Sequence, residues 1–404
     1  MNTVFNDVQK LKEKYKLKWD SIDTDITMLK QYSFWEKRAI QKQINASIND
    51  LLIRMDEIPS DDKSRQEWKN SLKTIVRQHA KLFLNIQNDE LENIMITGFT
   101  DVAEAFIDKA REFDKACTVT DIVQAIRNVW IMNIIQAIAN KKIEHTKSVF
   151  AYSMLYPCTD NFLDNPDITS DDKRKFNNRL RKRLEGNDIQ PESEHEKQIY
   201  DLICMIESQY NRDKYPKVIE SIISIHTGQC KSLEQQDNIA SSNESAILDI
   251  SIEKGGTSVL ADAYLVCGDL DEKLSDLMFG FGFVLQLIDD LQDAIEDYEN
   301  NHMTIFSRNV NKTKLDNLTN KLIAFTLKGL DLENYKESPY ILDIKKLIID
   351  NTLLLVFEAV WANRKLYTKK YKRNHQKYTP FNYSYLHRKM KRVKKKLKKL
   401  EGLM

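Results

Sequence analysis

An aspartate stripe follows a strongly apolar segment of the chain. Every residue from Phe279 to Leu285 is apolar or glycine, and Gln286, Asp289 and Asp293 then follow at spacings of three and four. These spacings place the three polar side chains on one face of a helix. Carboxylates beside a buried segment must be paired, metal-bound or on a cavity wall, and close like charges favour a divalent cation. We therefore expect Mg²⁺, which combines one or two carboxylates with substrate phosphate oxygens, whereas an amphipathic helix with a solvated Asp face is the alternative.

A second pair of acids, Asp160 and Asp164, stands at the end of another expected helix. The two residues are four apart and so share a helix face, and Pro166 disfavours helical geometry at Asn165. Two carboxylates at the negative end of a helix are unfavourable unless a cation is bound. The pair also fits a solvated acidic helix end before a loop. The predicted metal ligands are Asp160, Asp164, Asp289, Asp290 and Asp293.

Helices must position both acidic clusters, because helical periodicity runs through the whole chain. Apolar residues recur every three or four positions, as between Ile122 and Ala137, and no window alternates like a strand. Ten Gly and seven Pro in 404 residues are too few for a many-stranded protein. The sequence therefore predicts an all-α fold. Six of the ten glycines lie between Gly228 and Gly282, where we expect the backbone to approach a ligand or another helix closely.

Composition and charge exclude several classes of protein. With 42% hydrophobic and 30% charged residues, the chain can bury a core and is not disordered as a whole. Fourteen Lys or Arg and one acid lie between Lys369 and Glu401, so a net charge of +1 leaves the rest acidic and unsuited to gripping nucleic acid. The five Cys have no CxxC spacing, which favours a cytoplasmic protein without disulfides or zinc. We expect no signal peptide and no transmembrane span.

The motifs between residues 115 and 310 resemble those of the class I isoprenoid synthases, a family that includes trans-prenyltransferases (polyprenyl synthases) and terpene cyclases. Asp160 to Asp164 resembles the first DDxxD motif of that family, with Asn161 at its second position. Gly228-Gln229 resembles the family's GQ element, Lys254-Gly255-Gly256 resembles its KTG element, and Ala261 to Gly268 resembles its A…LG element. Phe283 to Asp293 resembles its second aspartate-rich motif, FQxxDDxxD.

The resemblance implies an isoprenoid synthase-like helical bundle around a central apolar cavity. The two acidic clusters would face each other across its mouth and hold Mg²⁺ around an allylic polyprenyl diphosphate. Lys254 would contact the diphosphate and act in catalysis with Asp160, Asp164, Asp289 and Asp293. Aromatic faces stabilise an allylic cation. The predicted substrate-binding residues are Arg127, Gln229, Lys254, Gln286, Phe279 and Phe283, and His226 is interpreted as an ordinary helix histidine.

Three functions stay open at this point. Chain-elongating members carry Arg-Arg-Gly after the first motif to hold isopentenyl diphosphate, and this chain lacks it, which favours a one-substrate terpene synthase or cyclase. A trans-prenyltransferase is the alternative, because Lys173, Arg174 and Arg179 could supply a cationic grip. A non-catalytic helical partner subunit is the third.

The chain divides into an N-terminal helical region (1–115), a class I core (116–368) and a basic tail (369–404). A helix from Arg388 to Leu400 would place four apolar residues on one side among basic ones, which suits peripheral binding to an anionic membrane. A solvated charged terminus is the alternative. The sequence leaves a homodimer open. The four apolar residues are Met390, Val393, Leu397 and Leu400.

Overall fold

Helices account for every regular element in the described part of the chain, which confirms the all-α prediction. A computed structural model describes residues 3–59, 61, 63–68, 70, 71, 74, 75, 77, 88–165, 167–237, 243–330, 338–385, 387–389, 391, 392 and 395; of Thr97, Asp164 and 234–237 it describes the backbone alone.

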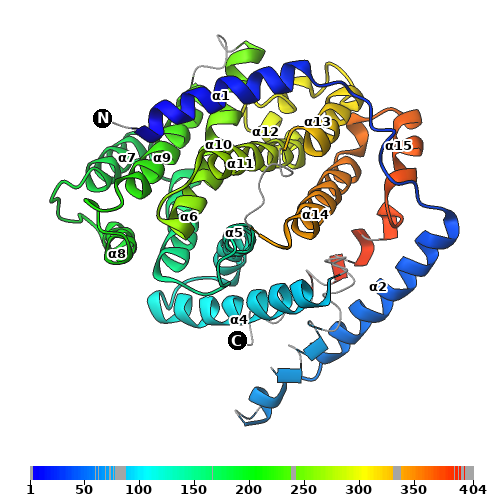
Figure 1. The fold of residues 1–404 in the computed structure, drawn as a ribbon, viewed down its shortest axis with the longest axis horizontal. Coiled ribbons are helices and arrows are strands. Elements are labelled where there is room, and N and C mark those ends of the chain that lie inside the picture. Colours follow the sequence, from blue (N-terminus) through cyan, green and yellow to red (C-terminus); the bar gives the residue numbers. More distant parts are fainter. Residues whose placement is uncertain are drawn as a thin grey trace.

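The helices follow one another in the order drawn in Figure 1. Short 3-10 turns, η2, η4 and η5, lie at Ser307–Asn309, Arg364–Leu366 and Gln376–Tyr378. The α-helices are α1 (Thr3–Ser21), α2 (Phe34–Arg54), α4 (Asp89–Phe113), α5 (Val119–Ile138), α6 (Lys147–Asp164), α7 (Ser170–Leu184), α8 (Glu194–Gln209), α9 (Pro216–Asp237), α10 (Glu244–Cys267), α11 (Glu272–Gln292), α12 (Ala294–Glu299), α13 (Asp316–Lys328), α14 (Ile341–Ala362) and α15 (Lys369–His375).

Side-chain caps fix where the helices of the core begin. Thr118 and Asp121 form a capping box at the start of α5, and Asn243 and Asp271 cap α10 and α11. Each cap oxygen accepts a hydrogen bond from a backbone N–H that has no partner within the helix. Gly268 ends α10 with a φ of 81°, a left-handed conformation that glycine adopts without a steric penalty. The capped helices α5, α10 and α11 are those that carry most of the predicted site.

The central helices α10 and α11 pack backbone against backbone. A Cβ atom at Gly255 would lie 2.6 Å from the carbonyl oxygen of Gly282, and one at Gly282 would lie 2.1 Å from that of Gly255. Neither position can therefore hold a side chain without separating the helices. The clustered glycines thus serve close approach, as predicted, and here the partner of each is the other helix. This packing fixes Lys254 on α10 relative to the acidic end of α11.

Phe279 and Phe283, which the sequence predicted as substrate-binding residues, belong to an aromatic part of the core. Both rings are fully buried, and they pack against aromatic residues of α1 and α13. The Phe279 ring also lies against Gly256 of α10, where an added Cβ atom would lie 2.5 Å from it. They are therefore core residues in this structure and are not among the residues that line the cleft described below. Their ring neighbours are Tyr15, Trp19 and Phe325.

The N-terminal helix α1 belongs to the same hydrophobic core as the acidic motifs. Residues of α1 and α4 share one apolar cluster with the helices from α5 to α14, so within the described residues the regions 1–115 and 116–368 have a common interior. Ion pairs fasten α1 further: Lys12 lies 2.9 Å from Glu253, and Lys14 lies 2.6 Å from Asp276. Figure 1 shows α1 lying across this group of helices.

The described part of the basic tail folds against the body. His375 is buried, and its ring lies 5.0 Å from that of Phe357 and 4.9 Å from that of Tyr371. Phe381 forms a small second cluster with apolar residues of α2. The apolar residues of the predicted tail helix, Met390, Val393, Leu397 and Leu400, lie outside the described residues.

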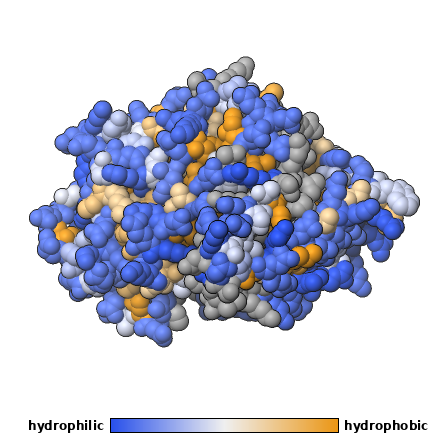
Figure 2. All heavy atoms as spheres, turned by 90° about the horizontal axis from the view of Figure 1, so that it is seen from below, coloured by the Kyte–Doolittle hydropathy of each residue, from blue (hydrophilic) through white to orange (hydrophobic). Residues whose placement is uncertain are grey.

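No helix in the described ranges is both long enough and apolar enough to pass through a bilayer. Figure 2 shows that the face seen from below is mainly hydrophilic, with apolar residues gathered in small groups between polar ones.

Candidate functional site

A cleft that is partly open to solvent lies among α6, α7, α9, α10 and α11, and the atom-free space there, open solvent included, is about 600 Å³. It brings together three of the predicted polar residues, Gln229 of α9, Lys254 of α10 and Gln286 of α11. These residues come from three different motifs of the sequence. The apolar residues of the lining are Leu155, Leu180, Leu184, Ile222 and Ile225.

The aspartate stripe continues from this cleft along α11. Asp289 and Asp293 follow Gln286 by one and two turns, and both side chains are exposed. The Asp289 carboxylate is also densely surrounded by protein, and the resulting desolvation is the largest influence that raises its pKa. A group that is both crowded and reached by solvent lies in a concave surface. For Asp293, desolvation and then the charges of Asp289 and Asp297 raise the pKa to about 6.

Two cations act on this stripe from neighbouring helices. The charges of Lys254 and Arg127 both lower the pKa of Asp289, against the dominant effect of desolvation, and Arg127 also lowers that of Asp293. Among the described residues, none lies within hydrogen-bond or ion-pair distance of the side chains of Lys254, Arg127, Asp289 or Asp293. Lys254 in the cleft lining, and Arg127, Asp289 and Asp293 outside it, thus act on one another electrostatically but are not paired within the described residues.

Asp290 faces the other way and is held by the protein. Its side chain is buried, and its two oxygens accept hydrogen bonds from Ser251 Oγ and Gln286 Nε2, each at 2.8 Å. Desolvation raises its pKa to about 6, although these hydrogen bonds oppose the shift. Asp290 was predicted as a metal ligand with its neighbours. In this structure it anchors Gln286 at the cleft, whereas the carboxylates of Asp289 and Asp293 have no hydrogen-bond donor among the described residues.

The first acidic motif lies beside α5. Asp160 Oδ2 accepts a hydrogen bond of 3.2 Å from Nε2 of Gln124, which lies on α5 one turn before Arg127. Helix α5 therefore contacts the first acidic cluster through the Gln124 hydrogen bond. The charge of Arg127 on the same helix lowers the pKa of two carboxyl groups of the second cluster, against the effect of desolvation. Asp164 is the last residue of α6, as predicted, and its side chain lies outside the described residues. Among the side chains that are described, no three His, Cys, Asp or Glu converge to hold a metal ion.

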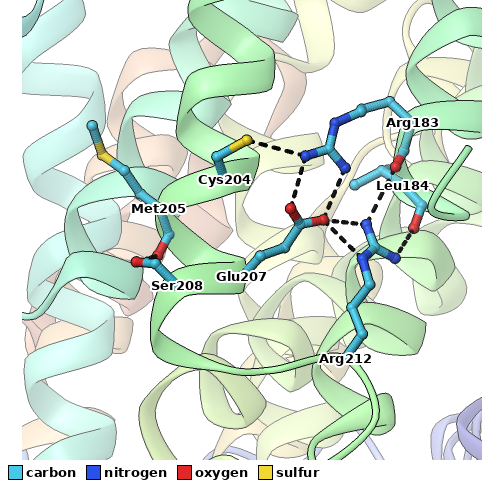
Figure 3. Close-up of polar contacts among 7 residues, drawn as sticks. All are labelled: Arg183, Leu184, Cys204, Met205, Glu207, Ser208 and Arg212. Atoms are coloured by element: carbon cyan, nitrogen blue, oxygen red, sulfur yellow. Dashed lines mark hydrogen bonds and ion pairs between the residues drawn. The ribbon is translucent and has the colours of Figure 1, made fainter. Parts of the chain in front are cut away.

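An ion cluster fixes the end of α7, which lines part of the cleft (Figure 3). The Arg183 guanidinium donates two hydrogen bonds of 2.8 Å to the Glu207 carboxylate, which also accepts from Arg212 Nε at 2.8 Å. Arg212 in turn donates to the backbone oxygen of Leu184 at 2.7 Å. Burial opposes ionisation of Glu207, but the two guanidinium groups hold its pKa below the ordinary value. The charge cluster thus holds the helix end that places Leu180 and Leu184 in the cleft.

The cleft also contains residues that the sequence did not identify as a site. Tyr152, Tyr156 and Thr159 line it from α6, at the spacing of four and three that keeps residues on one helix face. This spacing, directly before Asp160, is the signal that could have found them. His226 lines the cleft as well; burial lowers its pKa to about 4, so its imidazole is neutral near pH 7.

Comparisons with models of protein families, with curated proteins and with solved structures find no match to this chain. The site is therefore interpreted from its own residues.

Proposed function

We propose that this protein is an enzyme of the class I isoprenoid synthase type, which ionises one allylic polyprenyl diphosphate and acts as a terpene synthase or cyclase. The observation that carries the proposal is the charge on and next to the cleft lining. Among the described residues, the side chains of Lys254, Arg127, Asp289 and Asp293 have no hydrogen-bond or ion-pair partner, and Lys254 shares the cleft with several apolar residues. A ligand with one strongly anionic end and one apolar end matches this distribution.

The donor set of the stripe fits Mg²⁺. Asp289 lies on α11 and Asp293, four residues later, is the C-cap of that helix; both side chains are exposed. Besides desolvation, the negative charge of Asp289 raises the pKa of Asp290 and that of Asp293. A divalent cation removes this repulsion, and Mg²⁺ commonly takes one or two carboxylates together with phosphate oxygens. Bound there with the ligands proposed for it, Mg²⁺ would supply positive charge to the leaving diphosphate. The chain's own residues supply the remaining functions of the site.

Lys254 and Arg127 would hold the diphosphate and stabilise the negative charge that grows as its bond to carbon breaks. Gln229 and Gln286 would donate amide hydrogens, and Asp290 keeps the Gln286 amide in place by accepting one of them. Preorganised donors of this kind act most strongly where water is excluded. No nucleophilic side chain is needed for this reaction.

The apolar residues of the cleft lining would hold the prenyl chain. Leu155, Leu180, Leu184, Ile222 and Ile225 keep water from the allylic cation that ionisation creates. Tyr152 and Tyr156 line the same cleft, and their rings are suited to stabilising a cation.

Two of the three basic residues that could grip a second diphosphate, Arg174 and Arg179, already hold carboxylates. Arg174 lies 2.6 Å from Asp171, and Arg179 lies 2.8 Å from both Glu192 and Glu196. Guanidinium groups that already hold carboxylates are poor candidates for the grip on a second diphosphate.

The experiment is incubation with geranyl, farnesyl, geranylgeranyl and longer diphosphates plus Mg²⁺, with and without labelled isopentenyl diphosphate. We expect an unlabelled hydrocarbon or alcohol and released diphosphate from at least one substrate. Label in a longer prenyl chain would overturn the one-substrate proposal in favour of a prenyltransferase. Absence of turnover with the whole series would favour the non-catalytic partner subunit.

A further inference from the structure

Two large aromatic side chains project from the start of α2. Phe34 is 66% exposed and Trp35 is 71% exposed, and their rings lie edge to face with centroids 5.3 Å apart. Met28, in the segment that leads to α2, is 60% exposed. Single exposed apolar residues are common on protein surfaces, whereas two adjacent aromatic residues on one helix end form a feature that suits an interface. We name Phe34 and Trp35 the aromatic pair.

A strongly basic segment adjoins the aromatic pair. The sequence from Arg364 to Lys377 contains seven Lys or Arg and no acid. Its end is hydrogen-bonded to the start of α2: the backbone N–H of Tyr32 donates to Lys377 O at 2.9 Å, and the Lys37 ammonium donates to Gln376 O. The exposed basic residues of this segment are Arg364, Lys365, Lys369, Lys370, Arg373 and Lys377.

The pair and the basic segment are held on one rigid support. A capping box between Ser33 and Glu36 fixes the first turn of α2, which carries the pair. Buried His375 fixes the basic segment by packing its ring against Phe357. The acid nearest in sequence to the pair, Glu36, is shared between this cap and Lys30, which lies 3.5 Å from it. Two further acids act on this region: Asp316 accepts hydrogen bonds from Thr368, and burial and then the charge of Asp350 raise the pKa of Tyr32. The seven Lys and Arg of segment 364–377 outnumber these acids.

We propose that this surface, the aromatic pair with the basic segment 364–377, binds an anionic lipid membrane from the outside. Trp and Phe side chains settle at the level of lipid headgroups, while Lys and Arg are attracted to anionic lipids. Stable peripheral binding needs two signals of this kind. Single-stranded nucleic acid also uses basic side chains together with aromatic rings, on which its bases stack, so binding of RNA is measured as the competing outcome. Met28, exposed in the segment before α2, adds aliphatic surface that suits lipid rather than stacked bases. This surface is separate from the cleft and does not depend on the proposed reaction.

The test is co-sedimentation of the full chain with phosphatidylcholine vesicles that contain or lack phosphatidylserine. We expect binding that requires phosphatidylserine and weakens with salt. Removal of three charges in K369Q/K370Q/R373Q should weaken binding by about fivefold per charge. Matched control variants are K175Q/K182Q/K197Q on α7 and α8, at the opposite end of the molecule in Figure 1. F34S/W35S should also lose binding, whereas Leu17→Ser, at a 70% exposed position on α1, should not.

A second readout reports insertion itself. Vesicles with brominated acyl chains should quench part of the tryptophan fluorescence of the wild-type chain, and Trp35→Phe should remove that part while retaining an aromatic ring. Unchanged binding in both charge and aromatic variants would overturn the proposal. So would equal loss in the control variants, or binding of single-stranded RNA but not vesicles by the same basic segment.

Discussion

The charge of Asp293 contributes to stability in a pH-dependent way whose sign follows from its surroundings. Desolvation and the charges of Asp289 and Asp297 raise the pKa of Asp293 from 3.8 to about 6. The unfolded chain ionises this group near the ordinary value, so the native state binds the proton more tightly. The stabilising effect is fully present below the ordinary pKa and is lost as the pH rises through about 6. At neutral pH, the native state therefore carries an unfavourable charge.

A shift of about two pKa units corresponds to about 3 kcal/mol. Because the Asp293 side chain is exposed, solvent screens the repulsion, and we expect about 1 kcal/mol in practice. Asp293→Asn should therefore raise the free energy of unfolding by about 1 kcal/mol near pH 7.5, with a gain that shrinks on acidification and vanishes near pH 4. Mg²⁺ should stabilise the wild-type protein more than the variant, because the variant lacks one proposed ligand.

Thermal unfolding followed by circular dichroism, at several pH values with and without Mg²⁺, measures this difference. Asp201→Asn, at an exposed acid of α8, is the matched control and should change the midpoint little. A gain that is equal at all pH values would refute the reasoning, because it would not come from the titration of Asp293. A destabilised variant near pH 7.5 would refute it as well.

Three further predictions concern the site, the helix packing and the tail. Lys254→Gln should lower kcat/KM for the allylic diphosphate by about 10² to 10³-fold, as loss of a preorganised transition-state contact does, and Lys182→Gln on α7 should not; steady-state kinetics decides this. Gly255→Ala should cost about 3 kcal/mol or more, because its Cβ would lie 2.6 Å from Gly282 O, and a urea midpoint equal to that of the wild type would contradict the packing. Truncation after His387 should leave turnover of a short-chain diphosphate unchanged but weaken binding to anionic vesicles; loss of turnover would place the tail in the active site.

Local signals in the sequence were sufficient for much of this architecture. The all-α fold follows from helical periodicity and scarce Gly and Pro, and the end of α6 at Asp164 follows from Pro166. The spacing of the glycines predicted close backbone approach, which Gly255 and Gly282 show. The polar wall of the cleft was also predicted, since Gln229, Lys254 and Gln286 meet there.

Long-range packing determined what the sequence could not show. Phe279 and Phe283 lie on the helix that carries the aspartate stripe, but the contact of α11 with α1 and α13 turns both rings into the core. Asp290 lies between two candidate ligands in sequence, but one of its oxygens accepts a hydrogen bond from Ser251 of α10. In the sequence, Tyr152 and Tyr156 look like ordinary helix residues. They line a cleft because residues of α7 and α9 complete the lining. Such roles depend on partners far away in the chain, which periodicity does not reveal.

Release of diphosphate from an allylic substrate, in the absence of isopentenyl diphosphate, tests the central claim most directly. The account predicts Mg²⁺-dependent release by the wild-type chain, one diphosphate per substrate consumed, and a large loss in Asp289→Asn with the helical content unchanged. Release that continues at the wild-type rate in Asp289→Asn, or that does not require a divalent cation, would contradict it.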